Sequence, residues 1–282
     1  MKAHFGPGGN SDAFRLAGHK STLEAPAFVK EIGLDAYEYE AGNGLAASAA
    51  MLTAIGNEAK RCGIKMSFHT PYFISLSGLV EEKRLNSIRY IRESLDAAAL
   101  LGADTIVVHS GSAAKISRDE AMRLAADTLV RTLSEVDTHG VKIGLETMGK
   151  INQLGTLDEV LELCRIDKAF VPVVDFGHLN ARDLGGVFKT ADDYLRVFDK
   201  IGNALGDEVA KNLHCHFSKI EWTGGGEKKH LTFADETYGP DFEPLIDVIA
   251  RERLTPTVIC ESAGTQSDDA LMMKKYYLGR MA

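Results

Sequence analysis

The segment Thr105–Glu146, TIVVHSGSAAKISRDEAMRLAADTLVRTLSEVDTHGVKIGLE, contains one complete repeat of the pattern on which the fold depends. It opens with a short β-branched run that ends at His109 and closes with a second short apolar run that ends at Glu146. Between them, Ser117–Glu120 (SRDE) has the spacing of a capping box, whose Ser and Glu side chains accept hydrogen bonds from unpaired N–H groups at a helix start. The segment therefore predicts strand, helix and strand in succession, the unit of a parallel sheet.

The same alternation extends along the chain. Capping-box spacing recurs at Ser21–Glu24 and Thr156–Glu159, and Glu81–Leu101 has apolar residues three and four positions apart before Gly102, a common helix end. Eight short runs are predicted as strands: Lys2–Phe5, Ala36–Glu40, Ile64–His69, Thr105–His109, Val141–Glu146, Val171–Asp175, Asn212–Phe217 and Thr257–Glu261.

Eight strands in 282 residues give about 35 residues per repeat, as a βα unit requires. The pattern predicts an α/β fold in which the parallel sheet closes into a (β/α)₈ TIM barrel. An open doubly wound sheet is the alternative. Because no linker or break in composition divides the chain, one domain is predicted over residues 1–282.

The composition is that of an ordinary globular protein, with 45% hydrophobic and 26% charged residues. This excludes collagen-like, disulfide-dense and disordered classes. Forty acidic residues against 32 basic ones give a formal net charge of −8, which argues against a broad surface that coats nucleic acid. A small, focused phosphate site remains compatible with this charge.

Cysteine usage and hydropathy indicate the compartment. Cys62, Cys164, Cys215 and Cys260 lie far apart without a CxxC pair, so reduced thiols in a cytoplasmic protein are predicted. The N-terminus lacks the apolar core of a signal peptide, and no window approaches 18 uninterrupted apolar residues, so no membrane partner is expected.

Ionisable residues collect where the predicted strands end, which in a TIM barrel is the face that carries the chemistry. They are His69, His109, Glu146, Asp175, His178, His214, His216, His230 and Glu261. Such groups are costly to bury beside valine and isoleucine runs unless they are paired or bind metal. Nitrogen and carboxylate ligands together suit Zn²⁺, Mn²⁺ or Fe²⁺, so a metal centre is predicted in preference to unrelated structural histidines.

Strand alternation predicts which side chains face this centre. Residues two apart share a face, so His214 and His216 are expected to point to the barrel axis, with Cys215 and Phe217 toward the helices. By the same rule, Cys260 faces away from the centre if Glu261 faces in. Both thiols are therefore predicted to be packing residues rather than ligands.

The residues at these strand ends resemble the endonuclease IV family. The similar segments are His69–Leu76 (HTPYFISL), Val107–Ser112 (VVHSGS), Leu145–Thr147 (LET), Asp175–His178 (DFGH), His214–Lys219 (HCHFSK) and Cys260–Ser262 (CES). They follow the family's order and cover most of the chain from the third strand onward. The resemblance implies a TIM barrel of the xylose-isomerase-like superfamily that cleaves DNA 5′ to abasic sites with a metal-activated hydroxide and three zinc ions.

By position, the resemblance implies a ligand set for two or three Zn²⁺ ions, with Mn²⁺ as an alternative. The first ion is assigned to His69 and His109, with Glu146 bridging to the second. The second ion is completed by Asp175, His214 and Glu261. The third is assigned to His178 and His230.

The resemblance also implies roles in the reaction. Glu146 and Glu261 are predicted to be catalytic residues. Contacts to abasic-site DNA are predicted for Tyr72, Phe73, His216 and Lys219, the first two in a loop that the family inserts into the duplex.

The chain departs from the family's pattern in the loop that serves the third ion and in two early segments. The family's Asp-x-His pair is replaced by Lys228-Lys229-His230, so a carboxylate for the third ion must come from Glu227 or Asp235. An arginine-bearing early loop is replaced by Glu40–Gly44 (EAGNG), and His4–Asn10 differs from the family's opening.

Two other functions compete with the nuclease. A sugar isomerase or epimerase of the same superfamily would hold one divalent ion with Glu146, Asp175, His214 and Glu261, and its two glutamates would move protons beside a carbonyl of a sugar or sugar phosphate. The acidic charge and the aspartate lost from the third-ion loop favour it. The pair His69 and His109, which offers a separate metal site, and the Tyr72-Phe73 loop favour the nuclease. A barrel that binds metal or ligand without catalysis ranks last, because the core ligands are all present.

Overall fold

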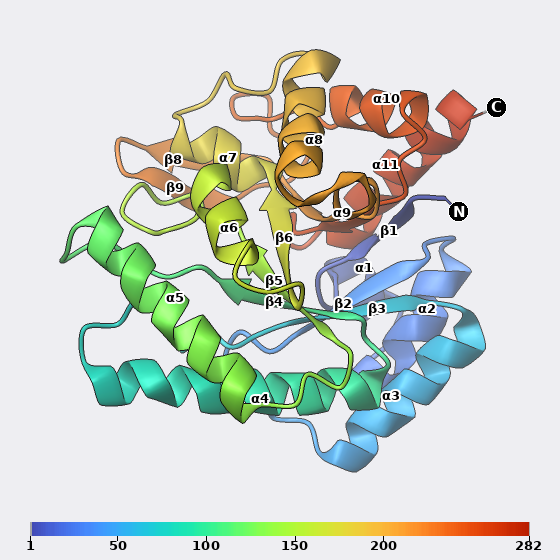
Figure 1. Ribbon diagram of the computed structural model, residues 1–282. Helices are drawn as coiled ribbons and strands as arrows, with labels where there is room; N and C mark the ends of the chain where they lie inside the picture. Colours follow the sequence, from blue (N-terminus) through green and yellow to red (C-terminus); the bar gives the residue numbers. More distant parts are fainter. Residues whose placement is uncertain (1, 282) are drawn as a thin grey trace.

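The computed structural model describes residues 2–281, which form an eight-stranded parallel barrel surrounded by helices (Figure 1). The barrel strands are β1 (His4–Pro7), β2 (Ala36–Glu40), β3 (Lys65–His69), β4 (Thr105–His109), β5 (Lys142–Glu146), β6 (Phe170–Asp175), β7 (His214–Phe217) and β10 (Thr257–Cys260). The TIM barrel prediction is confirmed, and each strand begins and ends within two residues of its predicted bounds.

The strands follow the order β1-β10-β7-β6-β5-β4-β3-β2, and every neighbouring pair is parallel. A parallel bridge between Gly8 and Glu38 joins β1 to β2 and closes the ring. At this seam a Cβ atom on Gly6 would lie 1.8 Å from the carbonyl oxygen of Ala36, so only glycine allows the two strands to approach.

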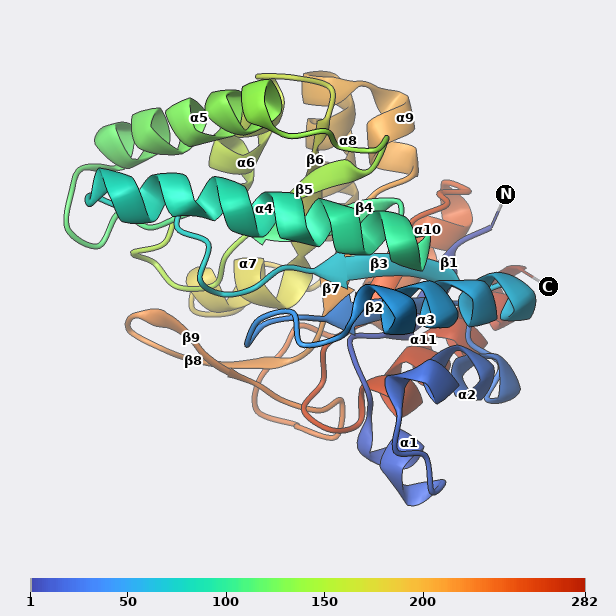
Figure 2. The same ribbon diagram turned by 90° about the horizontal axis from the view of Figure 1, so that it is seen from below.

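Helices cover the outside of the barrel. They are α1 (Asp12–Leu16), α2 (Ala25–Glu31), α3 (Ala49–Cys62), α4 (Glu81–Leu101), α5 (Arg118–Glu135), α6 (Leu157–Cys164), α7 (Phe176–Arg182), α8 (Ala191–Leu205), α9 (Asp207–Lys211), α10 (Glu243–Arg251) and α11 (Gln266–Met281). In Figure 2, α3 and α4 run beside β2 and β3, and α5 lies next to α4.

The predicted helix starts and stops are confirmed by their caps. The Ser117 and Thr156 side chains accept hydrogen bonds from backbone N–H groups three residues on, at the starts of α5 and α6. Ser21 caps a short 3₁₀ helix (Thr22–Glu24) that leads into α2. Gly102 ends α4 in the left-handed conformation, at φ 68°.

An antiparallel hairpin, β8 (Ile220–Thr223) and β9 (Gly226–His230), follows β7 and was not predicted. It packs against α7 and projects beyond the barrel in Figure 2. Gly224 and Gly225 form its turn, and Gly226 is the first residue of β9. The hairpin matters for function because it returns the chain to the C-terminal end of the barrel.

The hydrophobic core lies between the barrel and its helices. Cys215, Phe217 and Cys260 belong to this core, which confirms the prediction that they pack rather than face the barrel axis. All four cysteines are buried and unbridged. Within residues 2–281, no helix combines the length and apolar character needed to cross a membrane.

Candidate metal centre

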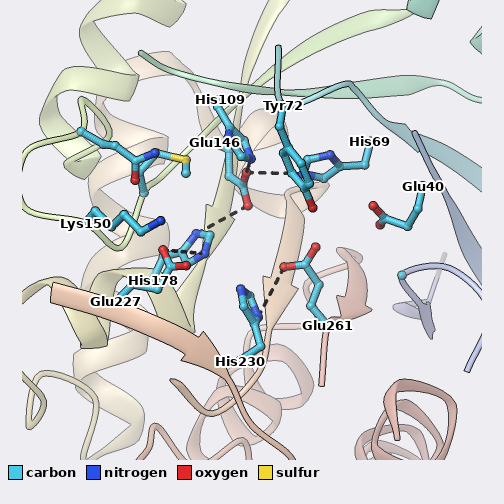
Figure 3. Close-up of a pocket in the computed structure, with 13 residues that line it drawn as sticks. Glu40, His69, Tyr72, His109, Glu146, Lys150, His178, Glu227, His230 and Glu261 are labelled. Atoms are coloured by element: carbon cyan, nitrogen blue, oxygen red, sulfur yellow. Dashed lines mark ion pairs between the residues drawn. The ribbon is translucent and has the colours of Figure 1, made fainter. Parts of the chain in front are cut away.

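A cavity of about 580 Å³ opens at the C-terminal ends of the barrel strands (Figure 3). Its lining comprises Gly8, Glu40, His69, Tyr72, His109, Glu146, Met148, Lys150, Gln153, His178, Glu227, His230 and Glu261. In Figure 3 the histidines and carboxylates converge on the same space from different strands. Most of the predicted ionisable residues therefore lie together here, and three groups of them combine histidine with carboxylate. A further group at the cavity, Glu38, Glu40 and Glu261, contains carboxylates alone.

The first group is formed by His69, His109 and Glu146, at the ends of β3, β4 and β5. Nε2 of His109 lies 3.3 Å from Oε2 of Glu146, and Nε2 of His69 lies 3.8 Å from the same atom. Nδ1 of His69 lies 3.0 Å from the carbonyl oxygen of Thr70, which can only accept a hydrogen bond. In the neutral ring that a metal ion requires, the proton is thus held on Nδ1, and Nε2 is left to bind the ion.

The second group contains Glu146, Asp175, His216 and Glu261. Nδ1 of His216 lies 3.0 Å from Glu146 and 3.4 Å from Glu261. Asp175 caps α7 through Oδ1, which accepts a hydrogen bond from the backbone N–H of His178. Its other oxygen, Oδ2, is buried and makes no hydrogen bond within residues 2–281. Glu146 belongs to both the first and the second group.

The structure brings His216 into this group instead of the predicted His214. Both histidines face the barrel axis, as predicted, but the β6–β7 register pairs Asp175 with His216 and Val173 with His214. His214 therefore lies two residues, or roughly 7 Å, below the level of the strand ends. There its Nε2 contacts Glu38 at 2.9 Å.

The third group consists of His178, Glu227 and His230. Nδ1 of His178 lies 2.9 Å from the carbonyl oxygen of Thr147, which fixes the proton there, and its Nε2 lies 3.5 Å from Glu227. The sequence offered Glu227 or Asp235 as the carboxylate of this group, and the structure places Glu227 there. Asp235 instead accepts hydrogen bonds from backbone N–H groups of its own loop.

Two glycines bring Glu227 to this position. A Cβ atom on Gly226 would lie 2.3 Å from the carbonyl oxygen of Gly149, and one on Gly149 would lie 2.6 Å from Cβ of Glu227. The hairpin can therefore approach the end of β5 only because both positions lack side chains. Nδ1 of His230, from the same hairpin, is held 2.8 Å from the Ser218 hydroxyl.

The predicted substrate contacts are distributed unevenly around the cavity. Tyr72 is 59% exposed, and its ring centroid lies 5.5 Å from that of His69 and 5.4 Å from that of His109. The described residues that line the cavity do not include Phe73, His216 or Lys219. His216 is fully buried among ligands, which is incompatible with a direct substrate contact, and Lys219 is paired with the carbonyl of Asp235.

Negative charge dominates the electrostatics of the centre. Burial raises the pKa of Glu261 to about 8, helped by Glu146 and Asp175 and opposed by His216. Burial likewise raises the pKa of Glu40 to about 7. For Glu146, burial would raise the pKa, but His216 and His69 more than offset it and hold the pKa well below its usual range.

The histidines respond to the same surroundings in opposite ways. Burial would lower the pKa of His69, but Glu40 and Glu146 raise it to about 10. For His109, burial prevails and lowers the pKa to about 3.

The residues of the centre fit divalent ions for two reasons. Carboxylates crowded together need positive charge near them. In addition, the buried Oε2 of Glu146 and Oδ2 of Asp175 make no hydrogen bonds within residues 2–281.

Sequence reasoning missed Glu38 and Glu40. Both lie on β2, whose sequence AYEYE alternates so that the two glutamates share one face and the tyrosines share the other. The alternation rule that orients His214 and His216 also identifies these two residues. Glu38 is fully buried, and Glu40 lines the cavity.

A parallel eight-stranded barrel with candidate ligand groups at its C-terminal strand ends defines the class of the protein, a TIM barrel with a candidate metal centre. More narrowly, the chain belongs to the xylose isomerase-like TIM barrel family, which it matches over residues 26–276. The predicted superfamily is thereby confirmed.

Proteins of similar sequence include one without a characterised function and one named as a nuclease. An uncharacterised protein of Methanocaldococcus jannaschii is 32% identical over 215 residues, which cover 76% of this chain and 77% of the M. jannaschii protein. A probable endonuclease 4 of Acholeplasma laidlawii is 29% identical over 189 residues, 65% of this chain and 62% of that one. Resemblance to the endonuclease IV family is therefore confirmed.

Solved structures share the fold over nearly the full chain. Endonuclease IV from Thermus thermophilus has a TM-score of 0.70 at 21% identity, covering 99% of this chain and 98% of that one. A D-tagatose 3-epimerase-like protein has a TM-score of 0.73 at 19% identity, with the same coverage. These likenesses confirm the fold and leave both a nuclease and an epimerase among its neighbours.

Proposed function

We propose that the protein is a metal-dependent phosphodiester hydrolase that cleaves DNA 5′ to abasic sites, as the endonuclease IV resemblance implies. The observation that carries this proposal is the presence of three ligand groups around one cavity, joined through Glu146. Glu146 belongs to the first two groups, and its Oε1 lies 3.6 Å from Nδ1 of His178 in the third. A single-ion centre would leave the histidine pairs on both sides of Glu146 without a role.

The chain's own residues would bind and orient the substrate. Two or three divalent ions bound here would lower the pKa of water toward 7 and neutralise charge on a phosphate. Tyr72 offers an exposed aromatic face at the cavity mouth, on which a base or sugar can stack. Lys150 lines the cavity and is available to a phosphate oxygen.

Zn²⁺ is the proposed ion, with Mn²⁺ as an alternative. The first and third groups each combine two imidazoles with one carboxylate, a donor set typical of zinc. The second group has three carboxylates and one imidazole, which also suits manganese. We further propose that the protein acts in the cytoplasm, where its four buried thiols stay reduced.

A divalent-metal sugar isomerase or epimerase is the second candidate. Glu146 and Glu261 would face a small substrate from two sides of a single ion held with Asp175 and His216. The Glu40–Gly44 loop favours this candidate, because it places a carboxylate, Glu40, at the cavity where the nuclease family carries an arginine loop. A carboxylate there would repel a DNA backbone.

One experiment separates the candidates. The protein is incubated with a duplex that contains a tetrahydrofuran abasic analogue, and separately with ketohexoses, each in the presence of Zn²⁺ or Mn²⁺. We expect a single incision 5′ to the analogue that Glu146→Gln removes and that Glu120→Gln, on α5 and outside the cavity lining, retains. Epimerised sugar without incision would establish the second candidate.

A further inference from the structure

A buried polar cluster adjoins the second ligand group and shares His216 with it. It consists of Glu38, Ser67, His214 and His216, and each is at most 6% exposed. Oε2 of Glu38 accepts a hydrogen bond from the Ser67 hydroxyl at 2.7 Å and lies 2.9 Å from Nε2 of His214. Its other oxygen, Oε1, lies 2.8 Å from Nε2 of His216.

The barrel fixes Glu38 in place. It lies at the seam where β1 meets β2, and its carbonyl oxygen accepts a hydrogen bond from Gly9. On its other side, the β2–β3 register sets Glu38 directly opposite Ser67. Its carboxylate is thus supported by backbone pairing on both sides and by the Ser67 hydroxyl.

His216 has two distinct sides. Nδ1 faces Glu146 and Glu261, at 3.0 and 3.4 Å. Nε2 lies 2.8 Å from Oε1 of Glu38, an ion-pair distance at which the two groups are not aligned for a hydrogen bond, and neither atom has another hydrogen-bond partner within residues 2–281. An imidazole that binds an ion through one nitrogen needs an acceptor for the N–H on the other, and a carboxylate is a common choice.

We infer that Glu38 is a positioning residue of the proposed metal centre: it holds the proton of His216 on Nε2 and turns Nδ1 toward Glu146, Asp175 and Glu261. This inference rests on the proposed centre and adds to it a residue that touches no ion. Ser67 and His214 contact the other oxygen of Glu38, Oε2, so they bear on the His216 ring only through Glu38.

A rival role for the cluster is an ion held by Glu38, His214 and His216 themselves, since their donor atoms also lie close together. That ion would have to share the His216 ring with the second group. It would also displace the contacts that Oε2 of Glu38 makes with Ser67 and His214. The positioning role uses these contacts as they stand.

Zinc binding by the full-length protein tests the inference. The apoprotein and its Glu38→Gln variant are titrated with Zn²⁺ against a chromophoric chelator, and Co²⁺ absorption spectra report the geometry of the bound ions. We expect Glu38→Gln to weaken one ion by 10- to 100-fold and to shift its Co²⁺ bands, because a neutral amide holds the ring less firmly. The number of ions at saturation should stay the same.

Ser67→Ala is the matched control, because it disturbs the same buried cluster without touching His216. We expect it to lower the melting temperature of the apoprotein about as much as Glu38→Gln does, yet to change Zn²⁺ affinity less than about twofold. If Glu38→Gln fails to fold, Glu38→Asp retains the carboxylate at a shorter reach and should weaken the same ion.

Each other outcome contradicts the inference in a recognisable way. Unchanged affinity and spectra in both Glu38 variants would make the residue merely structural. Loss of one ion at saturation would make it a ligand, as the rival role requires. A wild-type protein that binds no ion would contradict the metal centre itself, and this inference with it.

Discussion

At the scale of single residues, Glu146 connects the parts of the site. Its two oxygens approach His109 and His216 from different ligand groups, and the side chain is buried. Replacing it with glutamine removes a charge that two groups share while preserving the shape of the side chain. Among the described residues that line the cavity, Glu146 alone belongs to both the first and the second group.

We predict that Glu146→Gln lowers activity by at least about 100-fold, more than the loss expected for a residue that supports a ligand indirectly. Bound metal should fall in parallel, measured by elemental analysis of the purified variant. Full activity in this variant would contradict the proposed metal centre as a whole.

Tyr72 depends on a neighbouring glycine. A Cβ atom on Gly42 would lie 2.4 Å from the Tyr72 ring, so Gly42→Ala must displace the ring from His69 and His109. We predict a KM several-fold higher with unchanged metal content, as expected for a substrate contact that holds no ion. Steady-state kinetics check this, and a lower metal content would show instead that the ring supports the ligands.

The two histidines of β7 show what the sequence could and could not predict about single residues. Alternation along β7 correctly oriented His214 and His216, because side-chain direction is a local property. The prediction that His214 belongs to the second ligand group was not met, because that choice depends on the register with β6, which places His216 beside Asp175. Register is set by packing between strands and cannot be read from one strand alone.

At the scale of elements, the strands and helices were predictable and the hairpin was not. Capping boxes and apolar runs specify their elements locally, as Ser117 and Thr156 show. The hairpin strand β9 reads Gly-Glu-Lys-Lys-His, which carries no apolar alternation. Its position depends on Gly149 and Gly226, whose closeness appears only in three dimensions.

The start of α6 also supports the cavity. Glu159 accepts hydrogen bonds from the N–H groups of Gly155 and Thr156 and forms an ion pair with Arg118. Arg118 in turn donates a hydrogen bond to the carbonyl oxygen of Gln153, which lines the cavity. Burial would raise the pKa of Glu159, but the Arg118 guanidinium and these N–H groups lower it to about 2.

We predict a pH-dependent contribution to stability from this carboxylate. Because its pKa is lower in the folded state than in the unfolded chain, the stabilisation is present above about pH 4.5 and is lost as the pH falls toward 2. Glu159→Gln should cost about 1–2 kcal/mol in free energy of unfolding at pH 7 and less at pH 3.5, measured by urea titration. An equal cost at both pH values would mean that the carboxylate's charge is not involved.

At the scale of the whole molecule, the net charge of −8 counts Glu146, Asp175, Glu227 and Glu261 as free acids. In this account they are ligands, and bound cations offset their charge. The protein can thus be acidic overall and still bind a phosphate at one point, with attraction that comes mainly from the metal.

Metal removal should therefore weaken the fold as well as the activity. We predict that dialysis against a strong chelator lowers the melting temperature by several degrees, because an ion that binds only the folded state stabilises it. Adding Zn²⁺ back should restore the melting temperature. An unchanged melting curve with and without chelator would argue against ions in the barrel.

The central claim is that the barrel holds a polynuclear centre. Elemental analysis of protein purified without added metal or chelator tests it most directly, with concentration determined by amino-acid analysis. The account predicts two or three divalent ions per chain. One ion or none per chain would contradict it.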